Sequence, residues 1–226
     1  MVQKKHKKNI KKWTNIFLFK TLLIIINTFS LFKMVIIGFA GKMGSGKNHF
    51  AEKIIAPLLK SQGHQVVILA FADQLKVELM TKYGLSYTEV FENKTASTRD
   101  LLQKEGTSLG RDIRGADIWI KYLASWISIF TARGVNHILI TDVRFTNEAE
   151  WIKSQNGILV KIDAPDRTQN YCIARNISAE NRIHQSETQL DTYTDFDVII
   201  DNRLNIQQTD KLETSIGQLL HLIASK

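Results

Sequence analysis

The chain has 226 residues, of which 44% are hydrophobic, and its 30 basic and 22 acidic residues give a formal net charge of +8. This length suits one globular domain with a sizeable core, and the two prolines and twelve glycines exclude a fibrous or low-complexity chain. The single cysteine, Cys172, excludes an intrachain disulfide framework and has no partner for a zinc site, which indicates a reducing compartment.

The positive charge is concentrated in the first 33 residues. They contain eight lysines and no acidic residue, and taking these eight from the 30 basic residues leaves 22, equal to the 22 acidic residues. A net charge of +8 would ordinarily indicate nucleic-acid binding. Because the remainder is neutral, we expect no nucleic-acid partner for the folded part.

Residues 1–33 combine a lysine-rich start with an apolar run over 21–32, which resembles a signal anchor or signal peptide. Lys20 and Asn27 weaken the run, which is short for a membrane-spanning helix, and no small-residue cleavage site follows it. A lysine-rich start also stays cytoplasmic, so insertion would place the rest of the chain on the outer side of the membrane.

Three interpretations of this leader stay open: an over-extended start, a membrane-associated leader and a targeting peptide. An over-extended start fits best, because the Lys, Asn, Ile and Phe content is typical of translated A/T-rich non-coding sequence and Met34 directly precedes the first expected strand. We therefore expect a domain over 34–226 with 1–33 outside the fold. Membrane association is expected only if the leader is part of the protein.

The first expected element is an apolar strand, Val35–Phe39, followed by a glycine-rich turn and a helix over Lys47–Leu59. The turn matches the phosphate-binding pattern G-x-x-x-x-G-K in full. Its glycines let backbone N–H groups close around a phosphate, and the helix dipole and Lys47 face the same anion. The alternative is a glycine-rich turn that binds no ligand. The strand before it and the helix after it are the setting expected of a phosphate-binding loop, which argues against this alternative. The pattern predicts nucleoside triphosphate binding by Gly41, Lys42, Gly44, Ser45, Gly46, Lys47 and Asn48.

Apolar runs alternate with helical periodicity along the remainder, which predicts an α/β domain with a parallel sheet and helices on both faces. The other expected strands are Gln65–Phe71, His137–Thr141, Ile158–Ile162 and Asp197–Ile200. The other expected helices are Ala72–Tyr83, Thr98–Leu109, Ile118–Ala132, Asn147–Ser154 and Asp210–Ala224. No repeat or linker interrupts this pattern, so we expect a single domain.

An acid follows the strand His137–Thr141, as in a Walker B element, where the carboxylate holds Mg²⁺ directly or through water. Asp142 should lie near the phosphate loop, because ligands gather at the carboxyl ends of parallel strands. Arg144 lies two residues after Asp142, where it could contact a negatively charged phosphate. A purely structural Asp–Arg pair is the alternative. We expect Lys47, Asp142 and Arg144 to be catalytic and Asp142, with Asn48, to be near the metal.

Three further segments carry polar side chains that suit phosphoryl transfer. Arg99 and Arg111 flank an amphipathic helix. Taken alone, this pattern indicates only a helix with a solvent-exposed polar face. Asp73 and Lys76 lie where a strand meets a helix, at a candidate acceptor-binding corner. Arginines that include Arg167 and Arg175 follow the fourth strand and indicate a closing lid, because phosphoryl transfer needs cations around the moving group and exclusion of water.

The segments GKMGSGKN, LAFADQLK, TRDLLQKEGTSLGR, ITDVRFTNEAE and HQSETQLD with DFDVIIDN occur in this order. Together they resemble the deoxynucleoside monophosphate kinase family of bacteriophages and large DNA viruses, from Met34 to nearly the C-terminus. The most specific are ITDVRFTNEAE and LLQKEGTSLGR. Animal-type phosphomevalonate kinases share a similar loop and a similar Asp-x-Arg strand end and are the nearest rival.

The resemblance implies an adenylate-kinase-like P-loop fold, a three-layer sandwich with a helical acceptor region and a short lid. It implies ATP with Mg²⁺, a nucleoside monophosphate acceptor and a cytoplasmic location. It matches Lys47 to the loop lysine, Asp142 and Arg144 to the strand-end pair, and Arg99 and Arg111 to the acceptor region. Related loops often carry Asp where this chain has Asn48. Asparagine lacks the carboxylate charge, so which residue holds the metal is an open question.

From these residues we expect transfer of the γ-phosphoryl group of ATP to a deoxynucleoside monophosphate. A small-metabolite kinase of the phosphomevalonate type and a non-catalytic ATP-binding regulatory module are the alternatives. The extra arginines and the long helical acceptor region argue against the regulatory module. The sequence leaves the accepted bases and the oligomeric state open, a homodimer included.

Overall fold

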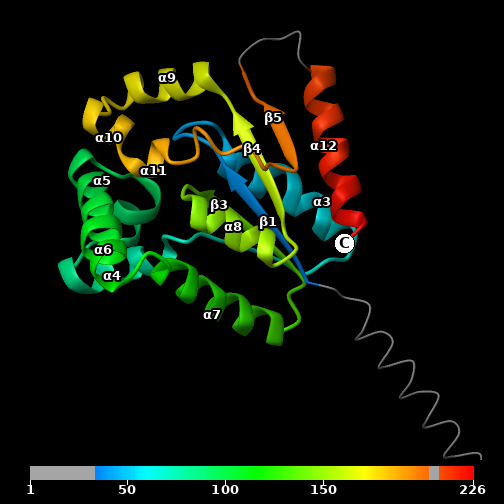
Figure 1. The fold of residues 1–226 in the computed structure, drawn as a ribbon, viewed down its shortest axis with the longest axis horizontal. Helices are drawn as coiled ribbons and strands as arrows, with labels where there is room; N and C mark the ends of the chain where they lie inside the picture. Colours follow the sequence, from blue (N-terminus) through cyan, green and yellow to red (C-terminus); the bar gives the residue numbers. More distant parts are fainter. Residues whose placement is uncertain (1–33, 204–208) are drawn as a thin grey trace, which may run out of the picture. The chain divides into compact units, whose positions relative to one another are not determined.

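The computed structural model describes residues 34–203 and 209–226, and the interpretations of the leader 1–33 lie outside them. Five parallel strands form one sheet in the order β2-β3-β1-β4-β5 (Figure 1). The strands are β1 (Val35–Ala40), β2 (Val66–Leu69), β3 (His137–Val143), β4 (Ile158–Asp163) and β5 (Val198–Asp201). The parallel sheet predicted from the sequence is confirmed, with each strand within three residues of its expected bounds.

The central strand β1 is buried along its whole length, because its sequence VIIGFA is apolar on both faces. Ile37 lies opposite Leu139 of β3 on one side and Ile158 of β4 on the other. A side chain at Gly38 would come within 2.4 Å of Ile152, so glycine lets a helix pack directly on the strand. This fixes β1, and the loop that follows it, at the centre of the sheet.

Helices cover both faces of the sheet and form two separate apolar cores (Figure 1). One core contains the continuous helix made of α2 (Lys47–His49), the π-helical stretch η1 (Phe50–Ile55) and α3 (Ala56–Ser61), together with α12 (Thr209–Ala224). The other contains α4 (Asp73–Tyr83), α7 (Ile118–Ala132) and α8 (Thr146–Ser154). This is the predicted three-layer α/β arrangement.

A group of short helices lies beyond the carboxyl ends of the strands, between α4 and α7 in the sequence. It consists of η2 (Thr88–Glu92), α5 (Ala96–Gln103), η3 (Lys104–Arg111) and α6 (Asp112–Arg114). The indole N–H of Trp119 donates to the Gly106 carbonyl at 2.8 Å, and a side chain at Gly110 would lie 2.6 Å from the same ring. Gly110 thus lets η3 approach α7 closely, whereas a side chain at Gly106 would lie 2.8 Å from Leu75 of α4.

The segment after β4, expected to form a lid, is helical. It contains α9 (Pro165–Ala174), α10 (Ala179–Ile183) and α11 (Gln185–Thr188), none of which the sequence periodicity predicted. Pro165 begins α9 at a position where proline is favoured, and the Ser178 side chain accepts the Asn181 N–H at the start of α10. These are local signals for the starts of helices that lack a periodic apolar stripe: α10 has only five residues, and Cys172 is the one buried residue of α9.

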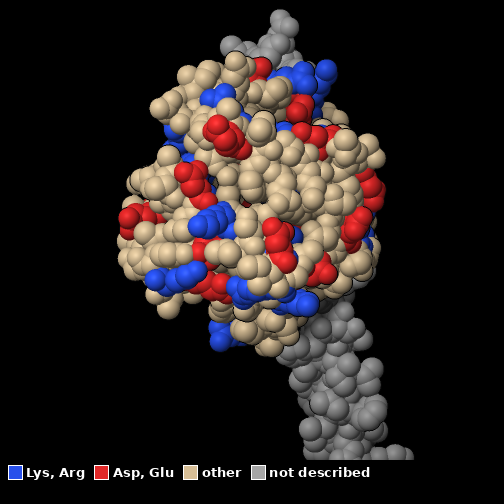
Figure 2. Space-filling view, turned by 60° about the vertical axis from the view of Figure 1, so that its left-hand side comes forward, with Lys and Arg blue, Asp and Glu red and all other residues tan. Residues whose placement is uncertain are grey.

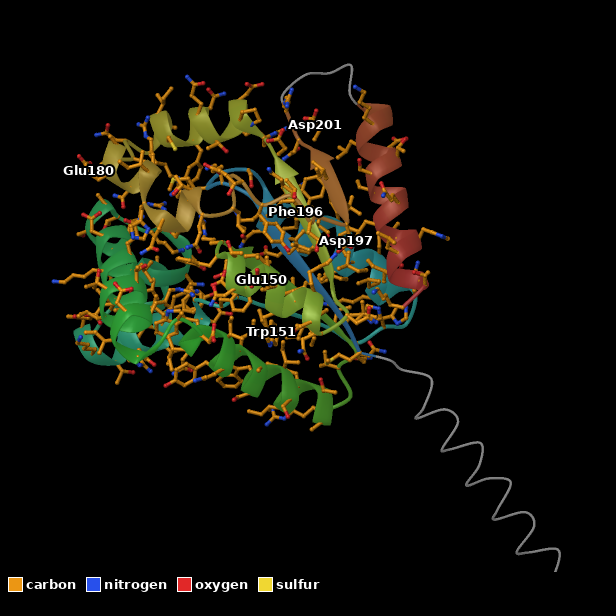
Figure 3. All side chains as sticks on the ribbon, in the orientation of Figure 1. Glu150, Trp151, Glu180, Phe196, Asp197 and Asp201 are labelled. Atoms are coloured by element: carbon orange, nitrogen blue, oxygen red, sulfur yellow. The ribbon has the colours of Figure 1, made fainter. Side chains whose placement is uncertain are left out.

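The edge of the sheet is fastened by polar contacts before and after β5. Asp197, labelled in Figure 3, accepts the Leu159 N–H at 2.7 Å and pairs with Lys153 at 2.7 Å. At the other end of β5, Arg203 pairs with Asp163 at 3.0 Å and lies 3.5 Å from Asp201. The two contacts hold β5 in register with β4 and place the turn after β5 beside the start of α9.

Acidic and basic side chains are both scattered over the face shown in Figure 2, in keeping with the neutral balance of this part of the sequence. Within residues 34–203 and 209–226, no helix combines the length and the apolar character needed to cross a membrane. Cys172 is buried and carries a free thiol.

Candidate functional site

The glycine-rich loop between β1 and α2 adopts a conformation that requires its glycines. Gly41, Gly44 and Gly46 have φ values of 142°, 74° and 103°, a region that favours glycine. A side chain at Gly44 would come within 2.5 Å of Tyr171 in α9. The hydroxyl of Ser45 is buried without a hydrogen-bond partner among the described residues. The glycines are therefore required by the conformation of the loop, and the Ser45 hydroxyl is left for a group from outside the described residues.

Lys47 lies inside this loop. Its ammonium group donates to the carbonyls of Gly41 at 2.6 Å and Lys42 at 2.8 Å. Burial lowers the pKa of Lys47 to about 7, and the nearby charge of Arg144 lowers it further, while the charges of Glu187 and Asp142 oppose the shift. An anion bound in the loop would stabilise the protonated form and raise this pKa.

Asp142 lies near the carboxyl end of β3, beside the start of α4. Its carboxylate accepts the N–H groups of Phe71 at 2.7 Å and Ala72 at 3.0 Å. Burial raises the pKa of Asp142, and the charge of Lys76 opposes the shift more strongly than the charge of Asp73 adds to it. Asp73 itself accepts from Lys76 at 2.9 Å. The structure thus brings the strand-end acid and the predicted acceptor corner together.

A cavity of about 890 Å³ opens beside the loop and collects most of the residues that the sequence singled out. They are Gly44, Gly46, Lys47, Asn48, Asp73, Lys76, Arg99, Arg111, Asp142, Arg144 and Arg175. Gly41 and Lys42 line a second cavity of about 560 Å³ on the other side of the loop. Neither cavity is lined by Ser45 or Arg167.

Seven Lys and Arg side chains line the large cavity. Besides Lys47 and Arg111 they form a group of five around Lys94, which consists of Lys76, Lys94, Arg99, Arg144 and Arg175. Burial lowers the pKa of Lys94 to about 8, and the charges of the other four cations lower it further. The Lys94 ammonium has a hydrogen bond to the Phe91 carbonyl at 3.0 Å. Sequence reasoning missed Lys94, because it lies in a loop between two short helices and belongs to no pattern. Six acidic residues also line the cavity, so the positive charge is concentrated around Lys94, and this part of the cavity suits a negatively charged ligand.

Tyr171 of α9 joins the loop to the helices beyond it. Its hydroxyl accepts a hydrogen bond from Arg99 at 2.9 Å, and the guanidinium of Arg175 lies 5.1 Å from the centre of its ring. The same side chain lies against Gly44. Tyr171 was also missed by sequence reasoning, and the need for glycine at position 44 is the only related signal. The contact closes the lid segment over the loop.

Arg111 and Arg167 are two predicted arginines whose protein partners hold them outside the group around Lys94. Arg111 forms a buried ion pair with Glu148 and lies with its guanidinium 3.7 Å from the centre of the Phe145 ring, so it forms part of the cavity wall. Burial raises the pKa of Glu148 to about 7, against the charge of Arg111. Arg167 lies outside both cavities and donates to the Asn202 carbonyl at 2.7 Å. The Asn202 amide in turn donates to the Ser45 carbonyl at 2.8 Å, which ties α9 to the loop.

No cluster of three or more His, Cys, Asp or Glu residues that could hold a metal ion is found in the part of the chain that the structure describes. Mg²⁺ commonly binds through one or two carboxylates while substrate phosphates and water supply the other ligands. Asp142 and the exposed Asn48 line the same cavity and offer one carboxylate and one amide oxygen. This oxygen donor set fits a magnesium ion that arrives with a nucleotide.

Comparison with known proteins finds a viral relative that is named as a kinase. It is 28% identical, over 194 residues, to a protein of Acanthamoeba polyphaga mimivirus named "Putative deoxynucleotide monophosphate kinase"; the match covers 77% of this chain and 92% of that protein. The chain is a relative of this viral protein. The resemblance inferred from the sequence motifs is thereby confirmed. No family model matches the chain.

Solved structures with similar folds cover most of the chain at low sequence identity. TT1252 from Thermus thermophilus is 16% identical with a TM-score of 0.50, covering 84% of this chain and 97% of that one. Shikimate kinase from Aquifex aeolicus is 18% identical with a TM-score of 0.42, covering 84% and 97%. The Mycobacterium tuberculosis APS kinase CysC, in complex with AMPPNP and APS, is 14% identical with a TM-score of 0.40, covering 83% and 98%. With its parallel sheet, its helices on both faces and its glycine-rich loop after β1, the chain has the P-loop-type α/β fold predicted from its sequence.

Proposed function

We propose that this chain transfers the γ-phosphoryl group of ATP to the 5′-phosphate of a deoxynucleoside monophosphate and forms the diphosphate. The observation that carries the proposal is the group of five cations in the large cavity, which includes Lys94 with its lowered pKa. Of these five, Lys76 pairs with Asp73 and Arg144 with Glu187, and an acceptor that is itself a phosphate would supply negative charge to Lys94, Arg99 and Arg175. The name of the mimivirus relative agrees with this acceptor class.

In the proposed reaction, an oxygen of the acceptor phosphate forms a bond to the γ-phosphorus of ATP. The bond between that phosphorus and the oxygen that bridges it to the β-phosphate breaks, and ADP leaves. No strong general base is needed, because the acceptor is already an anion. Loop N–H groups and Lys47 hold the donor, Arg144 faces the transferred group, and Lys94, Arg99 and Arg175 hold the acceptor.

In this proposal Asp142 and Asn48 are the protein residues nearest the metal. When bound, Mg²⁺ would neutralise charge on the ATP phosphates. The Phe71 and Ala72 N–H groups fix the Asp142 carboxylate, so its orientation does not depend on the metal. Asp73 and Lys76 adjoin Asp142 at the acceptor side of the cavity, and Arg111 supports the wall behind them.

The proposed domain spans 34–226, and a cytoplasmic location would give it access to ATP. Its product is a precursor of DNA synthesis. The test is a screen of acceptors with MgATP, in which each deoxynucleoside monophosphate, the matching ribonucleotides and phosphomevalonate are incubated separately and the products are separated by chromatography. We expect diphosphates from deoxynucleotides. Turnover of phosphomevalonate alone would support the small-metabolite kinase, and ATP binding without any product would support the regulatory module.

A further inference from the structure

The motif HQSETQLD has no role in the mechanism above, although α11 within it lies directly against the phosphate loop. The Glu187 carboxylate accepts the N–H of Met43 at 2.9 Å and forms an ion pair with Arg144. Only 8% of Glu187 is exposed, so water screens these contacts weakly. A lid carboxylate therefore contacts both the loop and the strand-end arginine.

Main-chain groups of the same helix reinforce this arrangement. The Arg144 guanidinium donates to the Ser186 carbonyl at 3.2 Å. Lys42 of the loop donates to the Glu187 carbonyl and to the Asp191 carboxylate. The segment is thus attached to the loop by three hydrogen bonds and to Arg144 by two.

These contacts form the partition between the two cavities. Four residues line both the large and the second cavity: Met43, Arg144, Ser186 and Glu187. Lys47, which also lines the large cavity, lies near enough for the charge of Glu187 to oppose the lowering of its pKa. Glu187 is therefore at the place where loop, lid and strand-end arginine meet.

An arginine assists phosphoryl transfer only when its guanidinium is aimed at the transferred group, and a displacement of about 1 Å can cost about a hundredfold in rate. A charged hydrogen bond to a buried carboxylate restrains a guanidinium more firmly than a contact with water does. We propose that Glu187 is a positioning residue whose carboxylate holds Arg144 and the Met43 N–H in the arrangement used for phosphoryl transfer. This inference rests on the proposed function.

A double-mutant cycle tests the proposal, because two residues that act through one another do not have additive effects. The four proteins are the wild type, Arg144→Ala, Glu187→Gln and the double variant. Glutamine keeps an acceptor for Met43 and removes the charge that holds Arg144. We expect Glu187→Gln to lower kcat about tenfold to a hundredfold while the KM for ATP changes by less than about threefold. The double variant should be no slower than Arg144→Ala alone.

Two further variants separate positioning from support of the fold. Glu187→Asp keeps the charge and should recover part of the lost kcat, and it replaces Glu187→Gln in the cycle if the glutamine variant does not fold. Asp191→Asn removes a charge from the same segment that contacts Lys42 but not Arg144; its kcat should stay within about twofold of wild type. Thermal unfolding of each protein shows whether it is folded.

Three results would overturn the proposal: multiplicative losses in the double variant, unchanged kcat for Glu187→Gln, and tighter ATP binding by that variant without loss of kcat. The last would mean that Glu187 takes the place of a phosphate. The same four proteins can also be compared by their rates of ATP hydrolysis by water, a reaction that needs no acceptor nucleotide. If that cycle behaves as expected while no deoxynucleotide is phosphorylated, the proposed function fails and the role of Glu187 stands. A wild-type protein that neither phosphorylates a deoxynucleotide nor hydrolyses ATP contradicts both the proposed function and the role of Glu187.

Discussion

The pKa of Lys47 makes ATP binding sensitive to pH. In the free protein, burial and Arg144 lower this pKa to about 7, so a growing fraction of Lys47 is neutral above pH 7. Bound phosphates favour the protonated form and raise the pKa, so binding takes up a proton above pH 7. ATP affinity should fall as pH rises from 7.5 to 9, by at most about tenfold per pH unit.

Calorimetry in buffers with different ionisation enthalpies measures this proton uptake directly. Lys47→Met is the control and should show weaker ATP binding without this uptake. An affinity of the wild type that is constant between pH 7.5 and 9, with no proton uptake, would mean that Lys47 does not titrate on binding.

Lys94 provides a test of the acceptor subsite at the level of one residue. Its neighbours are four cations that line the same cavity, and it lies in the loop before α5. Lys94→Gln should raise the KM for the deoxynucleoside monophosphate about tenfold or more, because a charge-assisted contact to phosphate is lost. The KM for ATP should change little. Steady-state kinetics with each substrate varied in turn measures both values.

Lys53→Gln is the matched control for Lys94, because Lys53 is an exposed lysine on the helix after the loop. Its kinetic constants should equal those of the wild type. Equal increases in the KM for ATP and for the acceptor in Lys94→Gln would place Lys94 outside the acceptor subsite.

The residues that form the site differ in how far the sequence predicts them. Lys47, Asp142 and Arg144 follow from the loop pattern and from the end of an apolar strand, since a parallel sheet gathers such ends. Lys94, Tyr171 and Glu187 could not be found in this way. Their roles come from contacts between segments distant in sequence, such as Tyr171 with Gly44 and Glu187 with Met43. No local spacing encodes those contacts.

At the scale of elements, the surroundings of Gly110 explain why the motif LLQKEGTSLGR has a glycine at this position. A side chain there would lie 2.6 Å from the Trp119 ring and 2.8 Å from the Glu105 carbonyl oxygen. Gly110→Ala should therefore destabilise the protein by about 1–3 kcal/mol, the cost typical of an overpacked core. Denaturant unfolding of both proteins measures the difference.

Gly217 of α12 is the matched control, because a side chain there meets no atom within 4 Å. Gly217→Ala should leave stability unchanged or raise it by about 0.5–1 kcal/mol, since alanine is the better helix former. If Gly110→Ala is as stable as the wild type, the close approach of η3 to α7 is not required.

The long elements were predictable, whereas the short helices of the lid were not. Strands buried on both faces have continuous apolar runs, and Ile118–Ala132 has an apolar stripe along its full length, so its predicted bounds equal the observed ones. Helices α10 and α11 contain five and four residues. They are held by caps and by contacts with the loop, and such helices show no periodicity.

At the scale of the whole molecule, all five described strands and every proposed site residue lie between Met34 and Arg203. We expect a protein that starts at Met34 to fold and to keep kcat within about twofold of the full chain, because no expected core or site residue is removed. Circular dichroism, solubility and turnover of the two proteins measure this. Aggregation or lost turnover of the shorter protein would mean that 1–33 contributes to the fold.

The most direct test of the account follows the γ-phosphoryl group of ATP itself. Radiolabelled [γ-³²P]ATP is incubated with Mg²⁺ and each deoxynucleoside monophosphate in turn, and labelled products are separated by chromatography. The account predicts label in the deoxynucleoside diphosphate, with transfer by the folded Lys47→Met variant slower by about a thousandfold. Label found only in inorganic phosphate, or equal transfer by Lys47→Met, would contradict it.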